Sequence, residues 1–207
     1  GALVAAGVAA LVGLGALRVR GLLLAVSTFA FGLAAQQYLY RRPFFSAGHT
    51  DSVPFERTSV LGIDLSSQRT YYWFCLVVLA VVIVVVARLR GTGIGRNTIA
   101  VRDNPDNAAA YTVRGSEVQL RAFALAGALA GLGGALLAGA IQTVPLTDRV
   151  FQVGDSLQLV AMVVIGGLGS VAGAVLGALW VVGLPAFFPD NDVVPLLTSS
   201  MGLLILL

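Results

Sequence analysis

The stretch Gly95–Glu117, GRNTIAVRDNPDNAAAYTVRGSE, is polar, whereas the sequence on both sides of it is strongly apolar. Thr70–Ala87 precedes it and Ala122–Ile141 follows it, and both runs approach the roughly 20 residues that cross a bilayer as a helix. A short polar segment between two such runs has to lie in water at one face of the membrane. The stretch therefore predicts a membrane protein with a water-exposed connection at this point.

Composition supports this prediction along the whole chain. The 207 residues are 57% hydrophobic and only 11% charged, whereas about 25% of a soluble domain is charged. The 25 glycines suit close helix packing in lipid, and the short alternating segments of a β-barrel are absent from the sequence. We expect an all-α fold, a polytopic transmembrane helical bundle in the cell membrane.

Apolar runs predict about six or seven spans, one of which is short. Ser156–Ile165 has ten residues, and it is either one leg of a re-entrant hairpin or part of a span that starts near Phe151. Because the chain begins and ends in apolar sequence, we expect residues 1–207 to be a single domain cut from a longer polypeptide. The other expected spans are Gly1–Leu17, Gly21–Tyr40, Thr70–Ala87, Ala122–Ile141, Val171–Phe188 and a run from Pro195 onward.

The arginines predict the orientation of the bundle. When the spans alternate, eight arginines fall on the side of the polar stretch and five on the other side, and the basic excess marks the cytoplasmic face. Residues 88–121 are therefore expected to form a cytoplasmic connection. The two sets are Arg18, Arg20, Arg88, Arg90, Arg96, Arg102, Arg114 and Arg121, against Arg41, Arg42, Arg57, Arg69 and Arg149.

This connection contains the signals of a short helix. Asn104 suits an N-cap and Pro105 the first helical position, and Asp106 in the first turn favours the helix dipole. We expect an amphipathic helix over Asn107–Val113 that stops at Gly115. Two interpretations stay open: the helix transmits force from a partner, or it lies on anionic lipid headgroups.

Glycines predict close packing and a tight turn. Gly127 and Gly131, and likewise Gly169, Gly173 and Gly177, recur at fourfold spacing, which leaves one helix face bare for a neighbour. Such faces either pack statically or slide during transport. The segment Gly166-Gly167-Leu168-Gly169-Ser170 lacks the Gly-Lys-Ser/Thr ending of a phosphate loop, so we expect a tight turn or re-entrant tip.

Enzymatic, metal-binding and nucleic-acid functions find little support. The chain has one cysteine and one histidine, too few for a conventional zinc site. His49 lies near Ser46 and Asp51, but a triad requires geometry rather than proximity, so we expect a loop residue. No basic stripe with stacking aromatics is present. We therefore expect no catalytic residues, no cofactor, no metal and no nucleic-acid partner.

The expected spans contain no Asp, Glu, Lys, Arg or His between their ends. Proton-coupled and many ion-coupled transporters carry such a group within the membrane. The energy for uphill transport is therefore expected from a partner ATPase. A channel, or a secondary transporter whose ions bind backbone carbonyls, stays the alternative.

Several blocks resemble the permeases of branched-chain amino acid ABC transporters, LivM type. Gly95–Asn104 with Ala108-Ala109-Ala110, then Arg121–Leu136, are similar to a cytoplasmic loop and the span that follows it. Val163–Ala178 resembles the family's most recognisable block, and Gly21–Phe31 an earlier span. The resemblance covers roughly residues 21 to 188.

This resemblance implies an importer for branched-chain or other apolar amino acids. It implies a second permease subunit, ATP-binding cassette ATPase subunits and an extracytoplasmic solute-binding protein as partners, besides membrane lipid. Related permeases carry urea or short amides, which gives an alternative solute. In the coupling loop Thr112 stands where the family usually has glycine, and Gln119 where lysine is common. The implied ATPase-coupling residues are Arg102, Asp103, Asn104, Pro105, Asp106, Ala108, Ala109, Ala110 and Thr112.

Overall fold

The computed structural model describes residues 1–17, 22–39, 52–55, 57, 64–145 and 153–188. Contacts divide the chain into two compact units, Gly1–Val150 and Phe151–Leu207, and each is described by itself. The expected run from Pro195 onward and the expected loop residue His49 lie outside the described residues. The fold is all-helical apart from one pair of three-residue strands in the described part of the chain.

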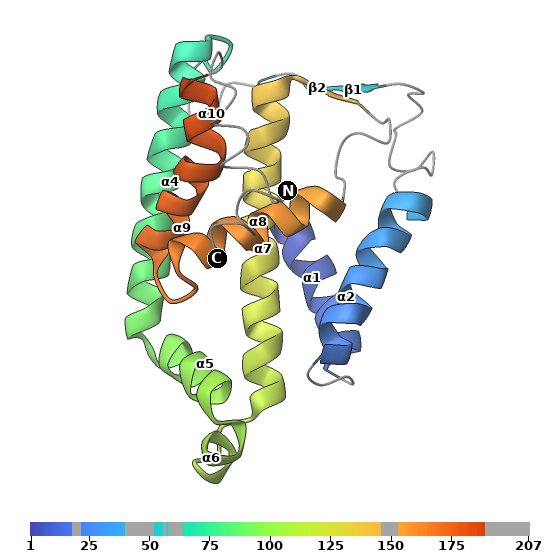
Figure 1. Ribbon diagram of the computed structural model, residues 1–207, viewed down its shortest axis with the longest axis vertical. Helices are drawn as coiled ribbons and strands as arrows, with labels where there is room; N and C mark the ends of the chain where they lie inside the picture. The colour runs from blue at the N-terminus through green and yellow to red at the C-terminus, as the bar shows by residue number, and fades with distance from the viewer. Residues whose placement is uncertain (18–21, 40–51, 56, 58–63, 146–152, 189–207) are drawn as a thin grey trace. The chain divides into compact units, whose positions relative to one another are not determined.

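Two long helices dominate the first unit (Figure 1). Helix α4 spans Gln68–Gly91 and helix α7 spans Gly115–Ile141. At 1.5 Å per residue they are roughly 36 and 40 Å long, which exceeds the roughly 30 Å of a bilayer core. α4 is rich in valine, a residue that favours strands in water. Its helix is explained by a lipid environment, in which the backbone has to satisfy its own hydrogen bonds.

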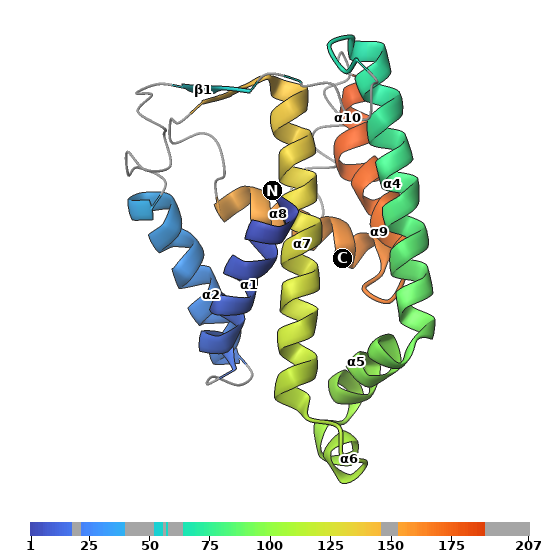
Figure 2. The same cartoon turned by 180° about the vertical axis from the view of Figure 1, so that it is seen from behind.

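Helix α1, Ala2–Ala16, packs antiparallel along α7 (Figure 2). Small residues allow this approach, because Ala5 and Ala9 of α1 meet the backbone of α7 at Gly131 and Gly127. Helix α2, Leu22–Ala34, follows and ends in a π-helical turn, η1, over Ala35–Leu39.

Strands β1, Ser52–Pro54, and β2, Thr143–Pro145, form an antiparallel pair at the end of α7. Val53 is opposite Val144, and the Phe55 N–H extends the ladder by donating to the Gln142 carbonyl at 2.7 Å. Neither three-residue run has a strand pattern of its own in the sequence.

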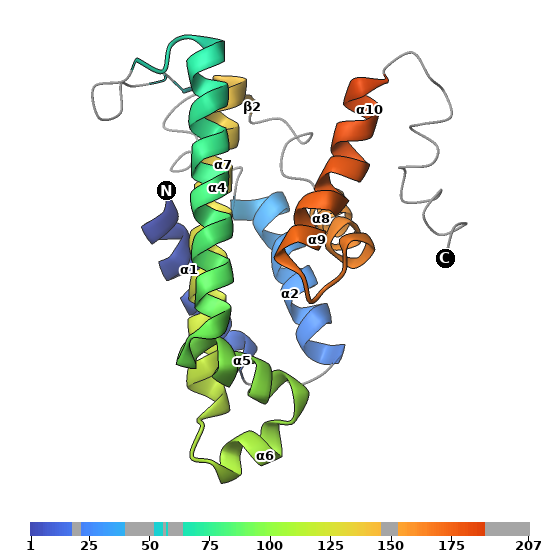
Figure 3. The same cartoon turned by 90° about the vertical axis from the view of Figure 1, so that its left-hand side faces the viewer.

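The second unit is a helical hairpin (Figure 3). Helix α8, Val153–Gly166, turns back into α9, Val171–Ala178, which continues through a π-helical turn, η2, over Leu179–Gly183, into α10, Leu184–Phe187. Pro185 lies at the start of α10, where its missing N–H removes one helical hydrogen bond. Helix α8 begins at Val153, close to Phe151, which is the start in one of the two alternatives that the sequence left open.

Two details of the expected connection were wrong. The expected helix Asn107–Val113 is instead α6, Pro105–Ala110, and Gly115 begins α7 rather than stopping a helix. An additional helix, α5, spans Gly93–Asp103. The sequence of α5 mixes glycine, arginine and single apolar residues, so it contains no apolar run that marks a helix.

Candidate functional site

The polar stretch folds into a compact helical unit between the long helices, which we call the connecting module, residues 92–118. α5 follows α4 after Thr92, α6 follows α5 after Asn104, and the chain then enters α7 (Figure 1). Val101 of α5, Ala108 of α6 and Val118 of α7 are buried against one another, and Val113 packs beside them. The module therefore has a small apolar core of its own, built from three helices.

Asn104 starts α6 as the sequence predicted. Its side-chain oxygen accepts the Asn107 N–H at 3.0 Å, and Pro105 occupies the first helical position. Such a cap contributes about 1 kcal/mol to helix stability. Because Asn104 is itself extended, with φ −153° and ψ 97°, it also sets the bend between α5 and α6.

The end of α6 is a Schellman motif with an unusual residue in it. The Thr112 N–H donates to the Ala109 carbonyl at 3.0 Å, and the Val113 N–H donates to the Ala108 carbonyl at 3.1 Å. The motif requires a left-handed residue, commonly glycine, and Thr112 fills this position with φ +62°. The family resemblance had placed glycine at this residue, and the backbone conformation gives the physical reason for that preference.

Burial separates the three alanines of α6. Ala108 is only 5% exposed and belongs to the module core, whereas Ala109 and Ala110 are exposed. Tyr111 follows them with 82% of its surface exposed. The family resemblance implied one coupling role for Ala108–Ala110, but the structure divides these residues into a core residue and an outward face.

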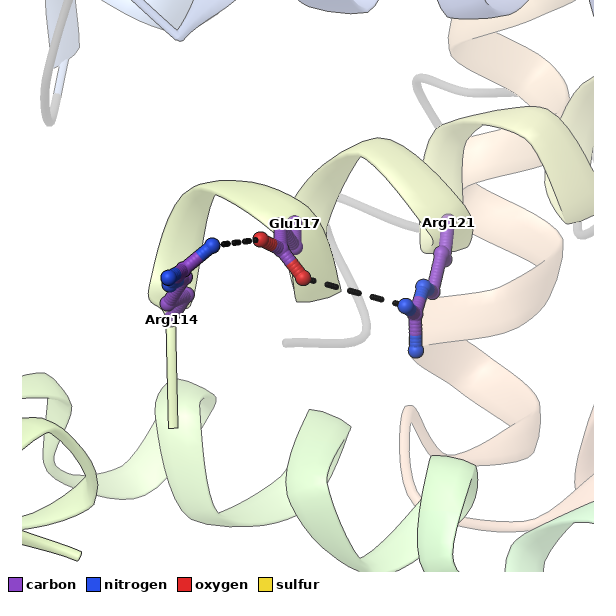
Figure 4. Close-up of polar contacts among 3 residues, drawn as sticks. All are labelled: Arg114, Glu117 and Arg121. Atoms are coloured by element: carbon purple, nitrogen blue, oxygen red, sulfur yellow. Dashed lines mark hydrogen bonds and ion pairs between the residues drawn. The ribbon is translucent and has the colours of Figure 1, made fainter. Parts of the chain in front are cut away.

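Ion pairs flank the module where it enters α7 (Figure 4). Arg114 Nη1 donates to Glu117 Oε1 at 2.8 Å, and Arg121 Nη2 lies 3.7 Å from Glu117 Oε2. The hydrogen bond to Glu117 raises the pKa of Arg114 above its ordinary value. Arg102 likewise bonds Asp103 at 2.9 Å. All these side chains are about half exposed or more, so the pairs orient the loop and add little stability.

The predicted packing glycines of α7 lie against α1. A Cβ on Gly127 would overlap Ala9, and a Cβ on Gly131 would overlap Ala5. Neighbouring Gly133 and Gly134 face open space, so the contact is specific to one face of the helix. The further interpretation, that this face slides during transport, stays a prediction.

The glycines of the second unit divide into three kinds. Gly166 and Gly173 bring the backbones of α8 and α9 into direct contact, and Gly177 lies on the Met162 carbonyl. Gly167 turns the chain with φ +96°, a conformation that glycine adopts without strain. Gly169 has open space around its Cα. Ser170 then caps α9 by accepting the Gly173 N–H at 3.1 Å.

The described residues contain no group of three potential metal ligands. The connecting module is a folded element that is joined at both ends to long apolar helices, so it is suited to transmit motion to them. The core roles of Val101 and Val118 could not be predicted from the sequence, because their burial depends on tertiary packing. Tyr111 was not predicted as a site residue either, although its place between the small residues and the polar turn is visible in the sequence.

Comparisons with known proteins identify the family. The family model described as "Branched-chain amino acid transport system / permease component" matches residues 1–189. No solved structure matches the chain. Helices α4 and α7 are long and apolar enough to cross a membrane, as a helical membrane permease requires.

Curated relatives name two kinds of transport system. The permease protein LivM of a high-affinity branched-chain amino acid transport system is 26% identical over 203 residues in both Salmonella typhimurium and Escherichia coli. The match covers 87% of this chain and 47% of LivM. The autoinducer 2 import system permease protein LsrC of Salmonella typhimurium is 34% identical over 114 residues, which cover 51% of this chain and 30% of LsrC. The chain thus spans less than half the length of these relatives, and it belongs to the family of permease components of branched-chain amino acid transport systems.

Proposed function

We propose that this chain is part of the membrane permease of an ABC importer and that the connecting module receives force from a partner ATPase. The observation that supports this proposal best is the folded module that joins α4 to α7 and has its own core of Val101, Ala108 and Val118. Because this core resists deformation, a displacement of α6 moves the ends of both long helices. The proposed partners are a second permease subunit, ATPase subunits and an extracytoplasmic solute-binding protein.

The outward face of α6 supports the docking part of this proposal. Asp106, Asn107, Ala109 and Ala110 are exposed, and Tyr111 projects beside them. Small residues let a partner approach the helix backbone, and tyrosine is among the residues enriched at binding hot spots. This face therefore combines one exposed aromatic side chain with a surface of small side chains, which suits a helix that binds in a partner's groove.

The proposed solute is a branched-chain or other apolar amino acid, in line with the LivM match over most of the chain. The LsrC match gives autoinducer 2 as the second candidate. Uptake of labelled leucine, valine, urea and autoinducer 2 into vesicles that hold the full-length protein and its co-purified ATPase separates these solutes. Transport that continues without ATP under a maintained ion gradient would instead support the secondary transporter.

The coupling face is tested by Ala109→Arg, which adds a bulky charge to the exposed surface. We expect uptake and co-purification of the ATPase to be lost while membrane insertion and the module's amide exchange stay unchanged. Ala100→Arg is the matched control, since Ala100 is an exposed alanine of α5, and it is expected to transport normally. If the single variants Ala109→Arg and Tyr111→Ala both showed normal uptake, the assignment of the coupling face would be contradicted. Ala108→Arg is unsuitable, because it would disrupt the core.

A further inference from the structure

An apolar groove lies between α4 and α7 at the ends of these helices that are far from the connecting module. Its cavity volume is about 330 Å³, and its walls are almost entirely hydrocarbon. One end is marked by Arg57 and Tyr71. The apolar lining comes from Phe55, Leu65, Phe74, Val78, Leu132 and Leu136.

The groove is long and narrow. Its lining runs from Tyr71 to Val78 on α4 and from Gly139 back to Leu132 on α7, which is roughly 10 Å along each helix at 1.5 Å per residue. A volume of about 330 Å³ over that length gives a cross-section of about 33 Å², whereas a helix with side chains, about 10–12 Å wide, has a cross-section of roughly 80–110 Å². A single extended hydrocarbon chain fits this width, and a whole helix does not.

A guanidinium lies at the mouth of the groove. Arg57 Nε donates to the Gly139 carbonyl at 2.7 Å, and Nη2 donates to Gln68 Oε1 at 2.9 Å and to the Ala140 carbonyl at 3.2 Å. Its remaining nitrogen, Nη1, has only a 3.5 Å contact with the Ser66 carbonyl. Among the described residues no carboxylate pairs with Arg57, and Nη1 makes no bond to them shorter than this 3.5 Å contact.

Aromatic residues place the mouth at the membrane surface. Arg57 stacks over the Tyr71 ring at 4.3 Å, and the Tyr71 hydroxyl donates to the Leu136 carbonyl at 2.6 Å. The next two residues of α4, Tyr72 and Trp73, are each 60% exposed. Exposed tyrosine and tryptophan at the end of a membrane-length helix mark the headgroup level. The guanidinium is therefore expected at the level of the lipid phosphates.

We propose that this groove binds one acyl chain of an anionic phospholipid, with the lipid phosphate at Arg57. Charge complementarity favours this occupant, because guanidinium and phosphate form strong charge-assisted hydrogen bonds. A free amino acid fits less well, since the described lining residues offer no carboxylate for its ammonium group. The lipid would fix the distance between α4 and α7 on the side opposite the connecting module.

The test uses a fluorescent reporter in the groove of the full-length protein. Phe74→Trp is placed in a background in which Trp73, Trp180 and any further tryptophan of the full-length protein are replaced with phenylalanine, and the protein is reconstituted in phosphatidylcholine vesicles. A small fraction of phosphatidylglycerol or phosphatidylcholine with brominated acyl chains then quenches any tryptophan it touches. Val77→Trp in the same background is the matched control, because Val77 is 60% exposed at a similar depth on α4.

Brominated phosphatidylglycerol is expected to quench the Phe74→Trp reporter more strongly than the Val77→Trp reporter, with an enrichment of about fivefold for one arginine facing one anionic headgroup. Brominated phosphatidylcholine should not discriminate between them. Arg57→Gln and the groove-filling Val78→Phe should each remove the stronger quenching of the Phe74→Trp reporter. If Arg57→Gln fails to fold, the result with Val78→Phe decides the test. Equal quenching by both lipids would reduce the groove to unselective lipid contact. If the reporter at position 74 were not quenched while the reporter at position 77 was, protein rather than lipid would fill the groove. Either result overturns the proposal.

Discussion

Replacing Thr112 with glycine should stabilise the connecting module. A left-handed conformation costs a residue with a Cβ roughly 1–2 kcal/mol, and Thr112 has φ +62° in the Schellman turn. Glycine gives back roughly 0.5–1 kcal/mol through its larger backbone entropy in the unfolded chain. The Thr112 hydroxyl bond to the Tyr111 carbonyl is exposed, so water replaces it at little cost. The net gain expected is about 0.5–1 kcal/mol.

Amide hydrogen exchange measures this gain locally. The Thr112 and Val113 N–H groups close the Schellman motif, so a gain of about 0.5–1 kcal/mol should slow the exchange of the Val113 amide by roughly two- to fivefold. Thr98→Gly is the matched control, because it makes the same substitution inside α5, where Thr98 Oγ1 donates to the Ile94 carbonyl at 2.9 Å. In this variant the amide hydrogens of α5 should exchange faster. Unchanged or faster exchange at Val113 in Thr112→Gly would refute the strain argument.

Three further outcomes follow from the contacts of the helices. Gly131→Ala should lower the thermal unfolding temperature of the purified full-length protein, because the new methyl overlaps Ala5 on the closely packed helix. Gly134→Ala should leave this temperature unchanged, since Gly134 faces open space. In the second unit, Gly173→Ala should lower the unfolding temperature in the same assay by forcing α9 off the α8 backbone, and an unchanged temperature would argue against that hairpin contact. Asn104→Ala should cost the module about 1 kcal/mol of cap energy, seen as faster exchange of the Asn107 amide.

The long helices were predictable because their signal is local. Thr70–Ala87 lies inside α4, and Ala122–Ile141 inside α7. The bounds differ where the helices leave the apolar core: α7 starts seven residues before the expected span, and its first turns contain Glu117 and Arg121. Such residues contribute no apolar signal, so hydropathy places the start of a span too late.

The parts that the sequence analysis missed depend on contacts between distant segments. Helix α5 is held by Val101 against Ala108 and Val118, an arrangement that no single stretch reveals. Fourfold glycine spacing indicated a bare face on α7 but not that α1 covers it. The sequence indicated only the charge of Arg57. Its hydrogen-bond partners on α7 are 82 and 83 residues away in the chain.

The pairing of β1 with β2 also limits what can join this end of the molecule. Each three-residue strand contains one proline, Pro54 or Pro145, and proline has no N–H to donate. A third strand approaching this ribbon would find an incomplete row of donors on a very short edge, and natural proteins use both features to prevent unwanted strand addition. The ribbon thus ties Phe55 and Gln142 together while remaining a poor template for further strands from another chain.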